Sequence, residues 1–326
     1  MALRIINAEL TRELLPMQDC IRVLQQAMIA ASNGSIAIPP RLVNSLTDDS
    51  ALFFLMPASS LELGVYGAKL IGLHPRNPAK HRPLIQGFVS LFDHETGKPI
   101  AIVDGAVISA IRTAAASGLA TQILAREDVT SCGIFGAGVQ AVAHIDAMCA
   151  VRPIKEFVIW GRDFDRTQRF AAEQAKRTGL NIYASENPGP AAACDLICTV
   201  TASPVPVLQG EWVSQGAHIN LVGAHTLTTR EADTELLVNS KVYIDLWESA
   251  RNEGGDVMIP IAEGAIEEDH IRGEIGQLLS GNIDGRKDDK EITLYNSLGI
   301  TAQDLFAAEY VYQKALSKGL GVCVEF

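Results

Sequence analysis

The chain has 326 residues, of which 48% are hydrophobic and 20% charged, and this length exceeds the usual size of a single hydrophobic core, so two domains are expected. The net charge of −11 excludes a nucleic-acid surface, which needs a basic patch to displace counterions from phosphates. No apolar run reaches the roughly 18 residues that span a bilayer, and the first residues lack the apolar segment of a signal peptide, so no membrane partner is expected.

The first part of the chain predicts a helix followed by a small sheet. Residues 16–33 place apolar side chains at helical spacing, and Gly34 ends this helix. Strand patterns follow at 51–56, 64–73, 84–92 and 99–103. Because turns link these strands and no helices alternate with them, we expect a small antiparallel sheet.

The middle of the chain alternates strands with helices. An alanine-rich helix at 108–125 leads into this part. Strands are expected at 129–135, 157–160, 181–183, 195–200, 218–222 and 241–245. This alternation predicts a doubly wound parallel sheet of the Rossmann type. We expect the chain to leave the sheet near Ile292, and we interpret the charged stretch 283–290 as a surface loop without a further role.

The end of the chain predicts one more helix. Thr301 and Asp304 have the spacing of a capping box, an apolar face follows, and Gly319 closes the helix. We expect this helix to pack on the first sheet. The predicted fold class is therefore α/β, with a smaller α+β domain at 1–116 and 298–326 and a Rossmann domain at 117–297.

A glycine turn follows the strand at 129–135. Gly136 permits a tight turn, and Gly138 has no side chain at the place where the backbone approaches a pyrophosphate. Ala141 then lets the next helix pack closely on the strand. Free N–H groups and the positive dipole end at the start of that helix favour an anion. The spacing predicts a dinucleotide-binding turn.

The residue after the next strand bears on the choice between NAD and NADP. Arg162 stands where an NAD-specific site usually has Asp or Glu. A guanidinium group pairs with a 2′-phosphate through charge-assisted hydrogen bonds. We therefore expect NADP(H) to be preferred and NAD(H) to be possible. Asp163 and Asp165 leave open the alternative that Arg162 is a solvated turn residue.

Three cations of the first domain, Arg41, Lys69 and Arg112, lie in apolar sequence. Burying a charge is expensive unless it meets an anion. Singly, each side chain could reach solvent; together they suggest a cluster that grips a carboxylate. Replacing Lys69 or Arg112 by Met is then expected to reduce activity and barely change the melting temperature. His225 follows the strand at 218–222 and is either a proton donor or a structural residue.

The six cysteines are scattered without a CxxC pair. This usage is typical of small core residues in a reducing compartment, so we expect a cytoplasmic protein. The nearest pair, Cys194 and Cys198, has no clustered His, so no metal site is expected.

Several segments resemble the ornithine cyclodeaminase/mu-crystallin family. They are GAKLIGL around Lys69, IRTAAASGLAT around Arg112, GAGVQA from Gly136, GR at 161–162, CTVTAS from Cys198, NLVGAH from Asn220 and YNSLGITAQD from Tyr295. The resemblance covers nearly the whole chain. It implies a homodimer whose N-terminal sheets join across the two-fold axis, with the smaller domain binding substrate and the Rossmann domain binding NAD(P).

The resemblance also implies roles for individual residues. The cations that bind the substrate carboxylate fall on Arg41, Lys69 and Arg112, and we expect Lys69, Arg112 and His225 to take part in catalysis. Cofactor contacts are expected at Thr113, Gly136, Gly138, Val139, Gln140, Arg162, Thr201, Val222 and Ser297.

One departure favours a branch of the family. Cyclodeaminases carry an aspartate in the loop after NLVG, where this chain has Ala224 and His225 and no carboxylate before Glu231. This favours a ketimine reductase that converts 1-pyrroline-2-carboxylate or 1-piperideine-2-carboxylate, a small cyclic imino acid, to L-proline or L-pipecolate. Three alternatives stay open: an ornithine or lysine cyclodeaminase using bound NAD, an alanine-dehydrogenase-like enzyme, and a non-catalytic binding protein similar to mu-crystallin.

Overall fold

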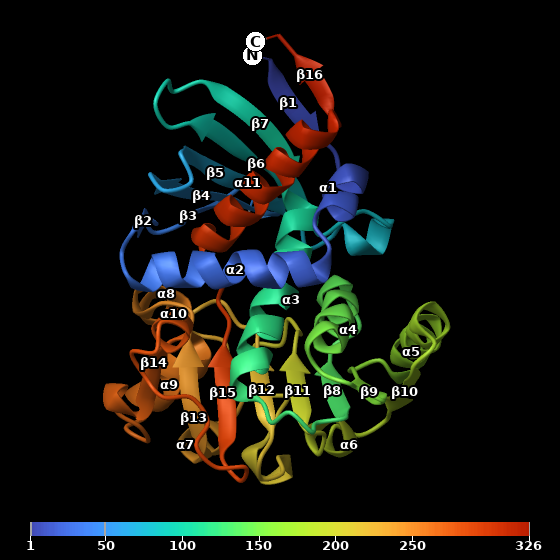
Figure 1. The fold of residues 1–326 in the computed structure, drawn as a ribbon. Coiled ribbons are helices and arrows are strands. Elements are labelled where there is room, and N and C mark those ends of the chain that lie inside the picture. Colours follow the sequence, from blue (N-terminus) through green and yellow to red (C-terminus); the bar gives the residue numbers. More distant parts are fainter. Residues whose placement is uncertain (1, 49, 326) are drawn as a thin grey trace. The chain divides into compact units, whose positions relative to one another are not determined.

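A computed structural model describes residues 2–48 and 50–325 (Figure 1). The chain divides into two compact units, unit 1 with Met1–Arg112 and Ile300–Phe326, and unit 2 with Thr113–Gly299. The sequence placed the first boundary after residue 116, and in the structure it follows residue 112. The sequence placed the second boundary before residue 298, and in the structure it precedes residue 300.

Unit 1 is built on a mixed sheet. Its strands are β1 (Leu3–Ile6), β2 (Ile36–Ala37), β3 (Leu42–Ser45), β4 (Leu52–Ser60), β5 (Val65–Leu73), β6 (Ile85–Asp93), β7 (Pro99–Asp104) and β16 (Val322–Val324). The order in space is β16-β1-β7-β6-β5-β4-β2, and β3 pairs with β4. The four expected strands form antiparallel pairs, but β1 joins β7 in parallel. The expectation of a purely antiparallel sheet was therefore wrong at this edge.

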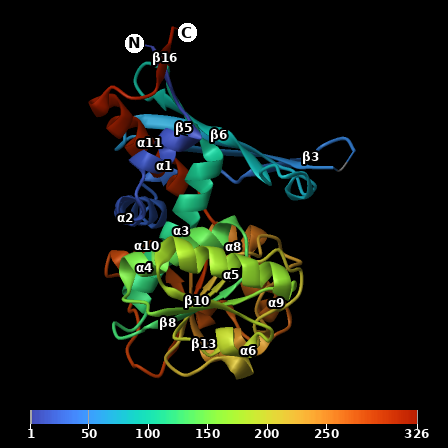
Figure 2. The same ribbon diagram turned by 90° about the vertical axis from the view of Figure 1, so that its right-hand side faces the viewer.

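Helices cover one face of this sheet (Figure 2). They are α1 (Ala8–Leu14), α2 (Met17–Ser32) and α11 (Thr301–Lys318). Side chains of β4 and β5 alternate between buried and partly exposed positions, because successive residues of a strand point to opposite faces. The buried positions of β5 include Lys69, on the face that packs against α11. The last helix thus packs on the first sheet, as expected, and ends at Gly319 with a positive φ of 66°.

Unit 2 is a parallel sheet of the expected Rossmann type. Its strands are β8 (Ser131–Phe135), β9 (Glu156–Trp160), β10 (Asn181–Ser185), β11 (Leu196–Thr199), β12 (His218–Leu221), β13 (Ser240–Ile244), β14 (Ile271–Glu274) and β15 (Ile292–Asn296). The order is β10-β9-β8-β11-β12-β15-β13-β14, with every pair parallel. The expectation that the chain leaves the sheet near Ile292 was wrong, because β15 lies between β12 and β13.

The helices of unit 2 lie between its strands along the chain, apart from α3, which precedes the first of them. They are the end of α3 (Gly105–Leu124), α4 (Val139–Val151), α5 (Phe164–Thr178), α6 (Gly189–Ala192), α7 (Thr234–Asn239), α8 (Trp247–Glu253), α9 (Gly255–Ala262) and α10 (Ile275–Leu279). By length and composition α3 could cross a membrane, but 72% of its most apolar window is buried inside the protein. A core helix has the same properties.

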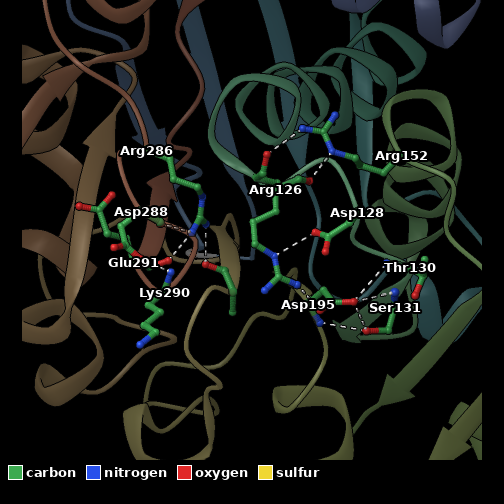
Figure 3. Close-up of polar contacts among 12 residues, drawn as sticks. Arg126, Asp128, Thr130, Ser131, Arg152, Asp195, Arg286, Asp288, Lys290 and Glu291 are labelled. Atoms are coloured by element: carbon green, nitrogen blue, oxygen red, sulfur yellow. Dashed lines mark hydrogen bonds and ion pairs between the residues drawn. The ribbon is translucent and has the colours of Figure 1, made fainter.

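The charged stretch 283–290 has a structural role that the sequence did not indicate (Figure 3). Arg286 donates hydrogen bonds to the carbonyl of Leu124 at the end of α3 (2.7 Å) and to the hydroxyl of Thr293 in β15 (2.8 Å). Arg152 also donates to carbonyls at the end of α3, including that of Ala125 (2.9 Å). Cations at a helix C-terminus satisfy its free carbonyls. The interpretation of 283–290 as a loop without a further role was therefore wrong.

Candidate functional site

The glycine turn of unit 2 has the geometry of a phosphate site. Gly136 has a φ of 123°, a conformation that favours glycine, and a Cβ there would lie 3.0 Å from the carbonyl oxygen of Val200. Around Gly138, by contrast, no described atom lies within 4 Å of a Cβ position, and no described side chain caps α4. The turn therefore leaves open space at a helix N-terminus, where N–H groups and the dipole favour an anion.

The first turn of α4 is tied to α3 by a buried histidine. The Nδ1 of His144 lies 2.8 Å from the carbonyl oxygen of Gln140, and its Nε2 lies 2.9 Å from the hydroxyl of Ser117. Burial lowers the pKa of His144 to about 4, so the ring is neutral. Nδ1 must then carry the proton, because a carbonyl only accepts. The backbone of Gln140, one of the expected cofactor contacts, is thus linked through His144 to α3.

The residue expected to select the cofactor lies at the end of β9. Arg162 is exposed, while the neighbouring Asp163 accepts a hydrogen bond from the N–H of Arg166 (3.0 Å) and so caps α5. The carboxylate of Asp163 is thus engaged in the protein. Arg162, two residues after the end of β9, is thus exposed beside this capping carboxylate.

The strand ends next to the glycine turn carry the other expected contacts of unit 2. Strands β8, β11, β12 and β15 are neighbours in the sheet, and Thr201, Val222 and Ser297 follow the last three of them. The hydroxyl of Ser297 is buried without a hydrogen-bond partner among the described residues. The hydroxyl of Thr201 donates to Glu231 (2.6 Å), so it is not free to donate to a ligand. Parallel strands bring these positions to one edge of the sheet.

His225 lies in the exposed loop after β12. Its Nδ1 is 3.1 Å from the carbonyl oxygen of Gly223, which fixes one ring nitrogen on the backbone. Proton donation by His225 stays a prediction. Thr113 in α3 is half-buried.

In unit 1, two of the three expected cations share one carboxylate. Lys69 Nζ lies 2.7 Å from Oδ2 of Asp304, and Arg112 Nε lies 3.1 Å from Oδ1 of the same side chain. Arg112 also donates to Oε1 of Gln303 (2.7 Å). All these side chains are buried. The anion that a lysine needs inside a strand is therefore supplied by α11.

The protonation state of Lys69 depends on its burial and on the charges around it. Burial lowers its pKa to about 7, Asp304 opposes that effect, and the charges of Arg112 and Arg41 add to it. Arg41 is thus electrostatically close to Lys69. The cluster is poised between a cationic and a neutral lysine near neutral pH.

The sequence predicted Asp304 as a capping residue and missed its pairing with the two cations. The expected capping box is wrong: Ile300 is the N-cap of α11, no described side chain caps the helix, and Asp304 turns to the two cations instead. A buried lysine in β5 was the signal that an acid must lie on the packed helix. The sequence predicted that Arg112→Met barely changes the melting temperature. We now expect this change to lower the melting temperature, because it would remove one partner of a buried carboxylate.

The parallel sheet and its glycine turn place this chain in the class of proteins that have a Rossmann unit of the dinucleotide-binding type. A model of the ornithine cyclodeaminase/mu-crystallin family matches residues 4–319, and the chain belongs to this family. The family and the fold class expected from the sequence are thereby confirmed.

Relatives of known name are similar over their full length. The chain is 32% identical over 324 residues to Delta(1)-pyrroline-2-carboxylate reductase of Bacillus cereus, covering 99% of both chains. It is 32% identical over 323 residues to alanine dehydrogenase of Archaeoglobus fulgidus, covering 99% of this chain and 98% of the other. The structure of Thermococcus litoralis Delta(1)-pyrroline-2-carboxylate reductase in complex with NADH and L-proline matches with a TM-score of 0.94 and 34% identity, covering 99% and 100%. These relatives are named as oxidoreductases of small imino or amino acids.

Proposed function

We propose that this protein uses NAD(P)H to reduce a cyclic imino acid carrying a 2-carboxylate, giving L-proline or L-pipecolate. The observation that carries the proposal is the buried pair of cations in unit 1, Lys69 and Arg112, which already converge on one carboxylate. With Lys69 protonated, the two cations outnumber Asp304, so an anionic substrate would complete the charge balance. The reductases among the relatives support the same reaction.

Different residues would have different roles in such a reduction. A nicotinamide cofactor supplies the hydride that adds to the C=N carbon. The open space at Gly138 and the uncapped start of α4 fit its pyrophosphate. Arg112 and Arg41 grip the substrate carboxylate, and Lys69 orients it and keeps the imine nitrogen protonated. A protonated C=N is already electrophilic, so correct placement is the main requirement.

Glu231 argues against the cyclodeaminase alternative. It is the first carboxylate after the loop in which cyclodeaminases have their aspartate, and it is fully buried. Both of its oxygens accept hydrogen bonds from the protein, on one side from Thr201 and on the other from Gly223. A carboxylate held in this way is not available to activate an amine for ring closure.

We further propose that NADP(H) is preferred, that the enzyme is cytoplasmic, and that it forms a homodimer. The exposed Arg162, beside a helix-capping Asp163, supports the cofactor preference. The dimer is supported by the face of the unit 1 sheet that α11 does not cover, where Phe53 and Phe88 are each 39% exposed. Exposed apolar patches mark association surfaces. Sedimentation of the purified protein tests the dimer.

A second candidate is oxidation of an open-chain amino acid, which the similarity to alanine dehydrogenase favours. One panel separates the candidates: NADPH and NADH oxidation with pyrroline-2-carboxylate, with piperideine-2-carboxylate, and with pyruvate plus ammonia, alongside ornithine with NAD. We expect stoichiometric oxidation with a cyclic imine and no ammonia requirement. Turnover of ornithine without net NAD reduction, or activity only with ammonia, would refute the proposal.

A further inference from the structure

A buried carboxylate links two strand ends at the edge of the unit 2 sheet where the glycine turn lies. Glu231 has no exposed surface, and its two oxygens accept four hydrogen bonds. The donors are the hydroxyl of Thr199 (2.7 Å), the N–H and hydroxyl of Thr201 (2.7 and 2.6 Å), and the N–H of Gly223 (2.6 Å). Thr199 and Thr201 belong to the end of β11, and Gly223 follows β12. One side chain therefore bridges two neighbouring strands beyond their last backbone contacts.

The two strand ends lie close together at this bridge. The last backbone hydrogen bond between them runs from Val222 N–H to the carbonyl of Thr199 (3.0 Å). Beyond it, a Cβ on Gly223 would lie 2.0 Å from the carbonyl oxygen of Thr201 and 2.6 Å from Cδ of Glu231. Only a glycine fits here, because any side chain would force the two loops apart. The spacing of the loops is thus set by Glu231 and the missing side chain of Gly223 together.

Glu231 is itself held by a second acid. Oδ1 of Asp256 in α9 accepts the N–H groups of Glu231 (2.8 Å) and Ala232 (3.0 Å). Both acids are fully buried, and burial raises the pKa of each, that of Asp256 to about 7. Two carboxyl groups in one dry site are costly for folding. A pair of apolar residues would be the cheaper way to fill the space, so the polar arrangement points to a role in geometry.

We propose that Glu231 is a positioning residue for the cofactor: it sets the distance and orientation of the loops after β11 and β12, which carry the expected contacts Thr201 and Val222. The inference rests on the proposed function, since it assumes that this edge binds NAD(P)H. Glu231 acts through the loops and does not touch the cofactor. Its loss therefore weakens the binding of both NADH and NADPH, whereas the preference between the two cofactors depends on Arg162.

A matched control lies at the other end of the same strand. Asp195 immediately precedes β11 and accepts hydrogen bonds from Arg126 Nη2 (2.9 Å), from the N–H groups of Thr130 (3.1 Å) and Ser131 (3.2 Å), and from the hydroxyl of Ser131 (2.9 Å) (Figure 3). It thus also ties β11 to its neighbourhood through four hydrogen bonds. It lies at the amino edge of the sheet, however, away from the glycine turn, which follows the carboxyl end of β8.

The experiment compares Glu231→Gln with Asp195→Asn in the full chain. Each change keeps the size of the side chain and turns one acceptor oxygen into a donor nitrogen, which faces donors in the protein. The dissociation constants of NADH and NADPH are measured by fluorescence titration, with melting temperature, KM and kcat as further readouts. Both variants are expected to melt earlier. We expect only Glu231→Gln to raise both dissociation constants, at least tenfold, with kcat at saturating cofactor changed much less than KM.

Thr199→Val serves if Glu231→Gln does not fold, because it removes one of the four hydrogen bonds and preserves the branched shape. We expect it to raise both dissociation constants severalfold. The positioning role would be overturned if Glu231→Gln or Thr199→Val bound both cofactors as tightly as the wild type does. It would also be overturned if Asp195→Asn lost as much cofactor affinity as they do. A wild-type protein that binds neither nucleotide would instead refute the proposed function, and the inference with it.

Discussion

Replacing Asp304 by Asn tests the buried charge cluster of unit 1 directly. The change keeps the shape of the side chain but leaves the buried Lys69 and Arg112 without their shared anion. Removing one partner of a buried ion pair costs about 3–5 kcal/mol. For domains of about 150 to 250 residues each kcal/mol lowers the melting temperature by roughly 2–4 °C, so we expect a loss of roughly 6 to 20 °C.

The loss should depend on pH, with a sign that follows from Lys69. Burial holds the pKa of Lys69 at about 7, below its ordinary value, and Asp304 keeps it from falling further. In the variant this pKa drops, so at pH near 6 wild type keeps a paired, charged lysine that the variant does not. At pH near 9 Lys69 is neutral in both proteins, and only the Arg112 partnership is lost. The destabilisation is therefore larger at low pH.

The assay is thermal unfolding at the two pH values, with Asp19→Asn as the control. Asp19 also contacts two cations, Arg22 (2.7 Å) and Lys314 (3.3 Å), but at a partly exposed place in the same unit. Exposed pairs contribute about 0 to 1 kcal/mol, so the control should move the melting temperature little. If Asp304→Asn melts like the control, or loses the same amount at both pH values, the carboxylate does not neutralise the cluster.

Three further predictions concern the proposed reaction. Gly138→Val should fold normally, since the space beside Gly138 is open and its φ is −122°, but it should fail to bind nucleotide. Wild-type nucleotide affinity of this variant in a fluorescence titration would show that the turn is purely structural. Arg162→Ala should raise the KM of NADPH roughly tenfold to a hundredfold, as expected for a charged hydrogen bond of about 1.5–3 kcal/mol, and spare NADH; equal losses refute its role. For Lys69, kcat/KM of the wild type should fall as pH rises through about 7, because the lysine loses its charge; Lys69→Met should have a lower kcat/KM and lack this step.

The sequence by itself determined most elements and the class of the fold. Apolar periodicity placed four strands of unit 1, six strands of unit 2 and the long helices, because a strand or helix exposes its pattern within a few residues. It missed β1, β2, β3 and β16 in unit 1 and β14 and β15 in unit 2, most of which are short. The glycine spacing from Gly136 to Ala141 located the turn of unit 2 for the same reason: the conformation it needs is local. The six expected strands of that unit are all present, with shifts of a few residues at their ends.

Only the tertiary structure decided what lies next to what. Strand β15 comes late in the chain yet lies between β12 and β13, since the order of a parallel sheet is set by crossover packing. Likewise Asp304 fits a local capping pattern, but it pairs with Lys69, 235 residues away, and with Arg112, 192 residues away. A buried lysine needs an anion more than a helix needs a cap, because the desolvation of a charge exceeds the roughly 1 kcal/mol of capping. Contacts of such long sequence separation leave no local pattern, so only the folded chain shows them.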